Sequence, residues 1–253
     1  MSSSTYIYGR RAVLEALSDA REVQKLYLQF GLRGEKVREI HRLARKKRIP
    51  ISTVDARKLR QLVGDAAHQG VVALIAPVPI RDFADLVERM EVLPRPRTFL
   101  LLDRLQDPHN VGAILRSGEV FGVTGVILSL RETVPITEAV VKASAGAALR
   151  VPLFRAANPA QAVQELQEQG VWIYGAAPEA AATLWEVDFT RDCAILIGNE
   201  EKGLRPLLQK RCDQLFSIPR VGKVQSLNAS VAAGIVLAEV LRQRLENREN
   251  DMQ

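Results

Sequence analysis

The sequence has few cysteines and no long apolar run, and each of these shortages excludes a class of protein. Two cysteines, Cys193 and Cys212, among 253 residues cannot build a disulfide framework, and neither has the C-x-x-C spacing of a redox or metal site. No uninterrupted apolar stretch reaches the roughly 18 residues that a membrane-spanning helix needs. The start, MSSSTYIYGRR, has no apolar segment between a charged leader and a cleavage site. We therefore expect a cytoplasmic protein with reduced thiols, no bound metal and no membrane partner.

The positive charge is unevenly divided along the chain. Residues 1–76 contain 15 Lys and Arg against 7 Asp and Glu, a net charge of +8, whereas residues 77–253 contain 20 against 22, a net charge of −2. This asymmetry is typical of a polyanion-binding module joined to a near-neutral one. For a single basic run such as Arg45-Lys46-Lys47-Arg48, a solvated helix face is the alternative explanation.

The apolar pattern predicts a small α/β domain at residues 1–76. Proline-rich sequence follows, including Pro94-Arg95-Pro96, which breaks helices, so a linker is expected over residues 77–97. The predicted helices and strands of the first domain are, in order, a helix over 12–17, a strand over 23–28, a helix over 35–47, a strand over 49–54, a helix over 55–63 and a strand over 71–76.

The second domain is expected over residues 98–253. Apolar runs alternate there with helical patterns, which predicts a parallel sheet covered on both faces. In such sheets ligands bind beyond the carboxyl ends of the strands, and the suggestive polar residues fall at those positions. The predicted strands cover residues 98–103, 125–130, 171–175 and 194–198.

The first motif is D-P-H-N-V-G-A-I-L-R, residues 107–116. Asp107 is suited to cap a helix and Pro108 to open it. The apolar residues of the motif form one face, which leaves Asn110 and Arg116 without a packing role. A guanidinium can hold a phosphate or carboxylate in a planar fork, although solvation at the surface is the more common explanation of an arginine taken alone.

The second motif is I-L-I-G-N-E-E-K-G-L, residues 195–204, a buried strand that runs into a turn bounded by Gly198 and Gly203. Glycine at these positions permits close approach of the backbone to a ligand, or a positive φ. No Lys-Ser/Thr follows the second glycine and the domain has no G-x-G-x-x-G after its first strand. The motif therefore argues against a nucleoside triphosphatase and a dehydrogenase.

The third motif is S-L-N-A-S-V-A-A-G-I, residues 226–235. Ser226 is predicted to cap a helix that is apolar nearly all round, and such a helix should be buried. Asn228 and Ser230 in its first turn then need polar partners, supplied either by local capping or by a ligand.

Together, in this order, the three motifs resemble the signature motifs of the SpoU branch of the SPOUT RNA ribose 2′-O-methyltransferases. The resemblance extends to Y-G-R-R-A-V at residues 8–13 and H-Q-G-V at residues 68–71, so it covers nearly the whole chain. It implies a C-terminal α/β domain with a parallel sheet and a deep trefoil knot, and a small N-terminal domain like ribosomal protein L30e. It also implies a homodimer with the active site at the subunit interface.

The resemblance further implies S-adenosylmethionine as cofactor and a guanosine of 23S ribosomal RNA, free or in a pre-ribosomal particle, as substrate. The implied catalytic residues are Asn110, Arg116, Glu200 and Asn228. The implied cofactor-binding residues are Ala176, Ala177, Ile197, Gly198, Asn199, Glu200, Ile218, Pro219, Leu227, Asn228 and Ser230. The expected RNA-binding residues are Arg10, Arg11, Arg45, Lys46, Lys47, His68 and Arg116.

Three alternatives remain at this point. A transfer RNA methyltransferase carries the same motifs, and a resistance methyltransferase acting on ribosomal RNA has the same chemistry. A catalytically silent RNA-binding or ribosome-assembly protein is the alternative outside the enzyme class, and it would not need Asn110, Arg116, Glu200 and Asn228 together.

Overall fold

The computed structural model describes residues 5–18, 23–76, 78–224 and 226–251. The chain divides into two compact units, Met1–Val78 with Ile136–Leu149, and Pro79–Pro135 with Arg150–Gln253. Pro77, where the predicted linker begins, lies outside the described residues. Within the described part, no helix is long and apolar enough to cross a membrane.

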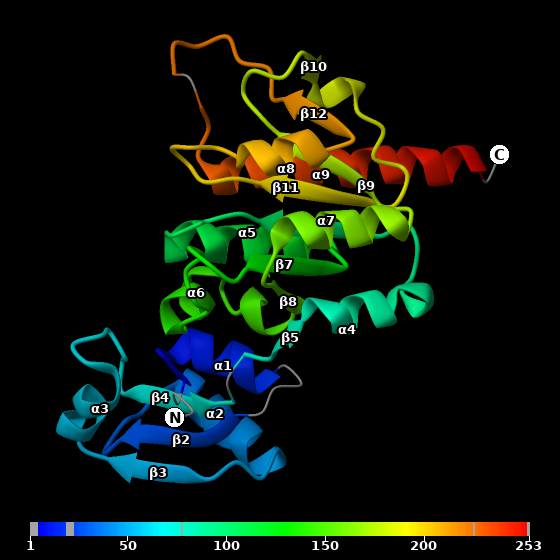
Figure 1. Ribbon diagram of the computed structural model, residues 1–253. Helices are drawn as coiled ribbons and strands as arrows, with labels where there is room; N and C mark the ends of the chain where they lie inside the picture. Colours follow the sequence, from blue (N-terminus) through cyan, green and yellow to red (C-terminus); the bar gives the residue numbers. More distant parts are fainter. Residues whose placement is uncertain (1–4, 19–22, 77, 225, 252–253) are drawn as a thin grey trace. The chain divides into compact units, whose positions relative to one another are not determined.

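The first unit contains a four-stranded mixed sheet in the order β1-β4-β2-β3 (Figure 1). β4 pairs antiparallel with both neighbours, and β2 pairs parallel with β3. The strands are β1 (Thr5–Tyr8), β2 (Val23–Gln29), β3 (Ile51–Val54) and β4 (Val71–Ile75). The helices are α1 (Arg10–Ser18), α2 (Glu35–Lys46), α3 (Ala56–Val63) and, later in the chain, α6 (Glu138–Ala143).

In the described part of residues 1–76, the elements from α1 to β4 agree with their predictions to within a few residues, whereas strand β1 was not predicted. The Asp55 carboxylate accepts a hydrogen bond of 2.7 Å from the Lys58 amide and so caps α3, as a short acidic side chain at this position should. Leu26, Ile40 and Leu59 are fully buried and bring β2, α2 and α3 into one core. The sequence pattern therefore specified this unit well.

The second unit contains an eight-stranded sheet in which every neighbouring pair is parallel, in the order β10-β12-β9-β11-β6-β7-β8-β5. The central strands are buried along their whole length, which explains their continuous apolar sequence. The strands are β5 (Ile80–Asp82), β6 (Thr98–Leu102), β7 (Gly125–Ser129), β8 (Leu153–Ala156), β9 (Trp172–Ala176), β10 (Ala182–Thr183), β11 (Cys193–Ile197) and β12 (Gln214–Ser217).

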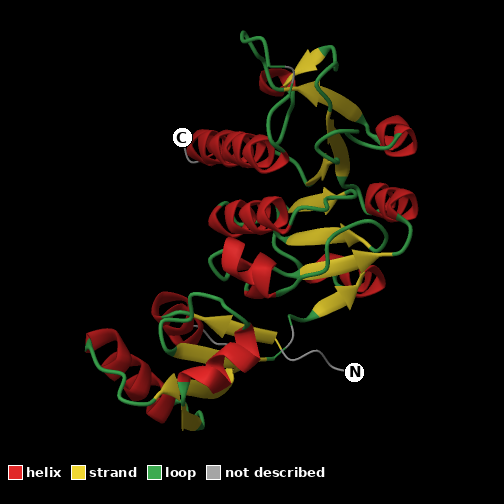
Figure 2. Cartoon of the chain, turned by 90° about the vertical axis from the view of Figure 1, so that its left-hand side faces the viewer, coloured by secondary structure: helices red, strands yellow, loops and turns green. Residues whose placement is uncertain are grey.

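Helices cover both faces of this sheet (Figure 2). On one face α5 (Pro108–Val120) packs against α9 (Ala229–Asp251). On the other, α7 (Pro159–Glu168) packs against α4 (Phe83–Glu88) and α8 (Pro206–Arg211). The predicted α/β fold with a parallel sheet is confirmed, whereas the trefoil knot stays a prediction.

The segment predicted as a linker is largely structured. It contributes the edge strand β5 and helix α4 to the second unit, and it buries Phe83, Leu86 and Met90 in the core. The spacing of these three residues places them on one helical face, which gives the segment an apolar surface to bury. The domain boundaries at residues 76 and 98 stay a prediction.

Buried ion pairs close the amino-terminal end of the large sheet. The Arg97 guanidinium, 1% exposed, donates from Nε (2.8 Å) and Nη2 (2.6 Å) to Asp192 Oδ2 and from Nη1 to the Met90 carbonyl (2.6 Å). From α9, Arg244 donates to the carbonyls of Pro96 and Phe189, among others, at 3.0 Å each. These arginines satisfy carbonyls that the start of a parallel strand would otherwise leave without donors.

Candidate functional site

The predicted site residues gather at the carboxyl ends of neighbouring strands. Ala176 ends β9 and Ala177 follows it, Gly198 follows β11 and Ile218 follows β12. These three strands are adjacent in the sheet. The Ala177 amide donates to the Phe216 carbonyl at 2.9 Å, which ties the first of these segments to the third strand. The parallel topology therefore unites segments that are far apart in sequence.

Three of the predicted catalytic residues form one hydrogen-bonded chain. The side-chain nitrogen Nδ2 of Asn228 donates to Asn110 Oδ1 at 2.8 Å, and Nδ2 of Asn110 donates to Glu200 Oε1 at 2.7 Å. Asn110 is 8% exposed, so its amide depends on these partners. One residue from each sequence motif thus meets in a single polar cluster.

The loop that carries Glu200 is folded tightly on itself. The amides of Asn199 and Gly203 each donate to the other residue's carbonyl, at 3.2 and 2.8 Å. A Cβ atom on Gly198 would lie 2.3 Å from the backbone of Gly203, so no other residue fits there. Asn199 Oδ1 accepts from the amides of Glu201 and Lys202 at 3.1 Å. The glycines of the second motif are therefore required by the loop itself.

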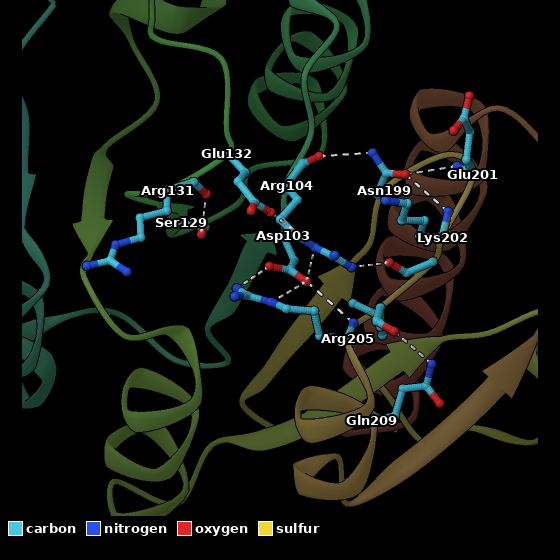
Figure 3. Close-up of polar contacts among 12 residues, drawn as sticks. Asp103, Arg104, Ser129, Arg131, Glu132, Asn199, Glu201, Lys202, Arg205 and Gln209 are labelled. Atoms are coloured by element: carbon cyan, nitrogen blue, oxygen red, sulfur yellow. Dashed lines mark hydrogen bonds and ion pairs between the residues drawn. The ribbon is translucent and has the colours of Figure 1, made fainter.

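A second polar cluster, which sequence reasoning did not identify, fixes this loop to the end of β6 (Figure 3). Asp103, fully buried, accepts from Nε (3.1 Å) and Nη2 of Arg205. Arg104 adopts a φ of +60° and donates from Nη2 to the Gly203 carbonyl at 3.3 Å, while its own carbonyl accepts from the Asn199 side chain at 3.1 Å. A charged residue directly after an apolar strand was the only sequence signal for Asp103.

The start of α9 differs from its prediction. The helix begins at Ala229, and the Asn228 side chain caps it by accepting from the Ser230 amide (2.9 Å) and hydroxyl (2.6 Å). Ser226 is therefore not the cap, because the helix starts later than the small-residue pattern indicated. The expectation of a fully buried helix is also wrong, since Val231 is 49% exposed.

Arg116 stands apart from the polar cluster. Six residues beyond Asn110 on α5, it lies about 9 Å further along the helix and about 120° around it. Its side chain is exposed, and it has no hydrogen-bond or ion-pair partner among the described residues. The structure therefore brings Asn110, Glu200 and Asn228 together in one chain but not Arg116.

The predicted RNA-binding residues other than Arg116, which lies in the second unit, separate into two groups within the first unit. Arg10, Arg11 and His68 line one surface depression, together with Lys36, which the sequence did not single out. Arg45 to Lys47 lie at the opposite end of α2 and line no part of it. Residues from the segments Y-G-R-R and H-Q-G, which carry part of the resemblance, thus line the same depression.

Neither cysteine is suited to be a nucleophile. Both thiols are free, and burial raises the pKa of Cys193 to about 11 and that of Cys212 to about 12. Thiolate is the reactive form, so both side chains are inert near neutral pH. Across the described ranges, no group of His, Cys, Asp and Glu side chains is arranged to hold a metal ion.

Comparison with known families agrees with this geometry. Residues 97–238 match the model described as the SpoU rRNA methylase family, a span that contains all three motifs and more than half of the chain. The chain belongs to the SpoU methyltransferase family. Residues 6–80 match a second model, the RNA 2′-O ribose methyltransferase substrate-binding domain. The predicted family relationship is confirmed.

Curated relatives and solved structures give the same assignment. A Staphylococcus haemolyticus protein named as a TrmH family tRNA/rRNA methyltransferase is 39% identical over 96% of this chain and 98% of its own. The SpoU methyltransferase AviRb from Streptomyces viridochromogenes superposes with a TM-score of 0.79 at 26% identity, over 96% of this chain and 91% of its own. A second AviRb structure, in complex with the cofactor AdoMet, gives a TM-score of 0.78 at 25% identity over the same fractions of both chains. The predicted cofactor is thus the one that this SpoU enzyme binds.

A transfer RNA enzyme is also among the structural relatives. The TrmH/SpoU tRNA modifying enzyme of A. aeolicus is 30% identical with a TM-score of 0.56, and the match covers 65% of this chain and 85% of that one. The SpoU family therefore includes members that act on different RNAs.

Proposed function

We propose that this SpoU family member transfers a methyl group from S-adenosylmethionine to the ribose 2′-hydroxyl of a guanosine in 23S ribosomal RNA. The observation that carries the proposal is the hydrogen-bonded chain of Asn228, Asn110 and Glu200, which joins all three motifs at the carboxyl end of the sheet. A protein that only bound RNA would not need this cluster.

The segments at the strand ends fit the methyl donor. Ala176, Ala177 and Gly198 are small and half-buried or better, so their backbone groups are open to an adenosine moiety. The apolar side chains of Ile218 and Leu227 can cover its ring. When bound, the donor supplies an electrophilic methyl group on a sulfonium, and the remaining proposed contacts come from Ile197, Asn199, Glu200, Pro219, Asn228 and Ser230.

The polar residues have positioning roles in this proposal. Asn110 has both its side-chain donor and its acceptor engaged, so it fixes the Glu200 carboxylate relative to the start of α9. Glu200 keeps unused lone pairs on two oxygens, which suit a donor from the cofactor or the ribose. Holding the reactants in line supplies much of the rate of a bimolecular transfer.

Arg116 is proposed to act in the site of a second copy of the chain. Its face of α5 is turned away from Asn110, and the adjoining helix α9 carries a stripe of exposed apolar side chains, Val231, Leu241 and Leu245. A homodimer formed through α5 and α9 would cover this stripe and supply Arg116 to the partner's pocket. There the guanidinium, a donor without an acceptor, would hold the RNA phosphate and the 2′-oxygen as charge develops on it.

The choice of ribosomal RNA rests on the basic first unit. The match to a substrate-binding domain and the net charge of +8 over residues 1–76 both indicate that this unit holds RNA. The match to the tRNA modifying enzyme covers only 65% of the chain, whereas the match to AviRb covers 96%.

The test is an incubation with S-adenosylmethionine labelled in its methyl group and with separate ribosomal and transfer RNA pools. We expect label in 23S RNA, recovered as 2′-O-methylguanosine when the RNA is digested and analysed by mass spectrometry. Label only in transfer RNA would contradict the substrate, and label on a base would contradict the ribose. No label in any pool would contradict the activity.

A further inference from the structure

The first unit contains a depression with an unusual concentration of hydrogen-bond donors. It is lined by the start of α1, the start of α2 and the turn between α3 and β4, and no Asp or Glu lies among its lining residues within the described ranges. An acceptor-rich, negatively charged ligand is therefore favoured. The lining residues are Arg10, Arg11, Gln29, Leu32, Lys36, His68, Gln69 and Gly70.

One wall of this depression is a strained turn that hydrogen bonds join to the start of α1. Gln69 has a φ of +50°, which is unfavourable for a residue with a side chain, and Gly70 follows at +77°. The Arg10 amide donates to Gln69 Oε1 at 3.3 Å, and Arg10 Nε donates to the Gln69 carbonyl at 3.4 Å. A Cβ on Gly70 would lie 2.8 Å from Leu32, so the turn sits directly on this apolar side chain. Strain of this kind, maintained by surrounding contacts, is a feature of binding sites.

Internal hydrogen bonds fix which atoms the turn offers to a ligand. The Gly70 amide donates to His68 Nδ1 at 3.0 Å, so the ring nitrogen that carries hydrogen is Nε2. Gln69 Oε1 already accepts from the Arg10 amide, which leaves the Gln69 side-chain amide as a donor. His68 Nε2 and the Gln69 side-chain nitrogen therefore remain as donors on two residues that line the depression with Arg10, Arg11 and Lys36.

We propose that this depression binds one unpaired guanosine nucleotide of the RNA substrate. Arg10, Arg11 and Lys36 contact its phosphates, although Arg11 also pairs with Glu15 at 3.0 Å. His68 Nε2 and the Gln69 amide donate to N7 and O6, two adjacent acceptors that distinguish guanine from adenine and cytosine, whose edges carry an amino donor. Unpaired bases with exposed edges are the usual targets of sequence-specific RNA recognition. The inference rests on the proposed function, because it identifies how that enzyme selects its RNA.

The phosphate contacts are tested by a matched pair on one helix. Lys36 and Lys46 are both exposed on α2, but only Lys36 lines the depression. Binding of the full chain to a fluorescein-labelled 12-nucleotide oligoadenosine with one central guanosine is measured by anisotropy. We expect Lys36→Glu to weaken binding by at least about tenfold and Lys46→Glu by less than about threefold. Removing three contacts, in Arg10→Ala/Arg11→Ala/Lys36→Ala, should lower the slope of log affinity against log salt by about 2.

Equal losses in Lys36→Glu and Lys46→Glu would overturn the proposal, because binding would then follow the overall charge. Both substitutions lie at exposed helix positions, so folding should not obscure the result, and circular dichroism verifies it.

The base contacts are tested by comparing the guanosine-containing oligonucleotide with oligoadenosine alone. We expect the wild-type chain to bind the former about fivefold more tightly, within the discrimination that one bidentate base contact gives. His68→Phe and Gln69→Gly should abolish this difference while affinity for oligoadenosine stays within about twofold; Gln69→Gly also relieves the positive φ. A wild-type chain without preference, or one that prefers uridine in the same position, would overturn the assignment to guanosine.

Two outcomes separate this inference from the proposed function. If the chain methylates ribosomal RNA but Lys36→Glu and Lys46→Glu behave alike, only the depression is wrongly assigned. If the oligonucleotide results are as expected but no RNA pool accepts methyl groups, the guanosine-binding depression is supported and the proposed methyl transfer is contradicted.

Discussion

The two ends of the large parallel sheet carry polar residues with different roles. At the amino-terminal end, Arg97 and Asp192 are buried and pair with each other. At the carboxyl-terminal end, Asn228 and Asn110 hold Glu200 in a hydrogen-bonded chain, and Glu200 keeps free lone pairs. Further along α5, Arg116 is exposed and has no partner within the described part of the chain. Arg97 and Asp192, which neutralise each other, therefore stabilise the fold, whereas Glu200 and Arg116 keep hydrogen-bonding capacity that a ligand can use.

The largest effect is expected from a substitution that breaks the Arg97–Asp192 ion pair at the amino-terminal end of the sheet. Asp192→Asn leaves the Arg97 guanidinium buried without its counter-charge, and loss of one partner of a buried pair destabilises by about 3–5 kcal/mol. Urea denaturation measures this change in unfolding free energy. Asp188→Asn is the matched control, since the Asp188–Arg191 pair at the same end is half exposed and should contribute less than about 1 kcal/mol. Equal effects of the two substitutions would contradict the distinction.

At the other end, Arg116→Ala should leave stability unchanged and lower kcat by about 10²- to 10³-fold, the range seen when a group that stabilises transition-state charge is removed. Calorimetry should show unaltered binding of S-adenosylhomocysteine. Arg116→Lys should recover only part of the activity, because an ammonium cannot form the planar fork. Full turnover by Arg116→Ala would remove this residue from the mechanism.

A smaller effect is expected from Asn110→Ala, which removes the link between Glu200 and Asn228. We expect kcat to fall by about tenfold, since hydrogen bonds to a charged group contribute about 1.5–3 kcal/mol when intact. Steady-state kinetics at saturating RNA measures the change. Activity equal to that of the wild type would show that the three-residue chain only supports the fold.

The smallest effect tests the cluster around Asp103. Arg205→Ser removes a partly exposed arginine that fixes the loop of Glu200, while the buried Asp103 keeps Arg104 as an ion-pair partner at 3.5 Å. We therefore expect KM for S-adenosylmethionine to rise about threefold, roughly the value of one net hydrogen bond, with kcat little altered. Arg211→Ser, at the far end of α8, is the control. A fall in kcat without a change in KM would indicate that the cluster acts on the chemical step instead.

The central strands of the large sheet were predictable because apolar periodicity reflects burial, whereas β5, β8, β10 and β12 were not predicted. The buried strands β6, β7, β9 and β11 appear as apolar runs at their predicted places. The sequence could not predict that residues 80–92 join the second unit, because the prolines around them resemble those of a linker.

The candidate site was predictable only in part. The motifs located Asn110, Glu200 and Asn228, but their hydrogen bonds join residues 90 and 118 positions apart, and no local pattern encodes such distances. Asp103 and Arg205 form their pair across 102 positions, so this cluster had to be found in the structure. The same holds for Lys36, which only the folding of α2 against α1 brings to Arg10.

A crystal structure with S-adenosylmethionine or S-adenosylhomocysteine tests the central claim most directly. The account predicts that the ligand lies against Ala176-Ala177, Gly198–Glu200, Ile218-Pro219 and Leu227–Ser230, with its reactive end facing Arg116 of a second copy. A ligand bound at the amino-terminal end of the sheet, or one that contacts none of these segments at saturating concentration, would contradict it.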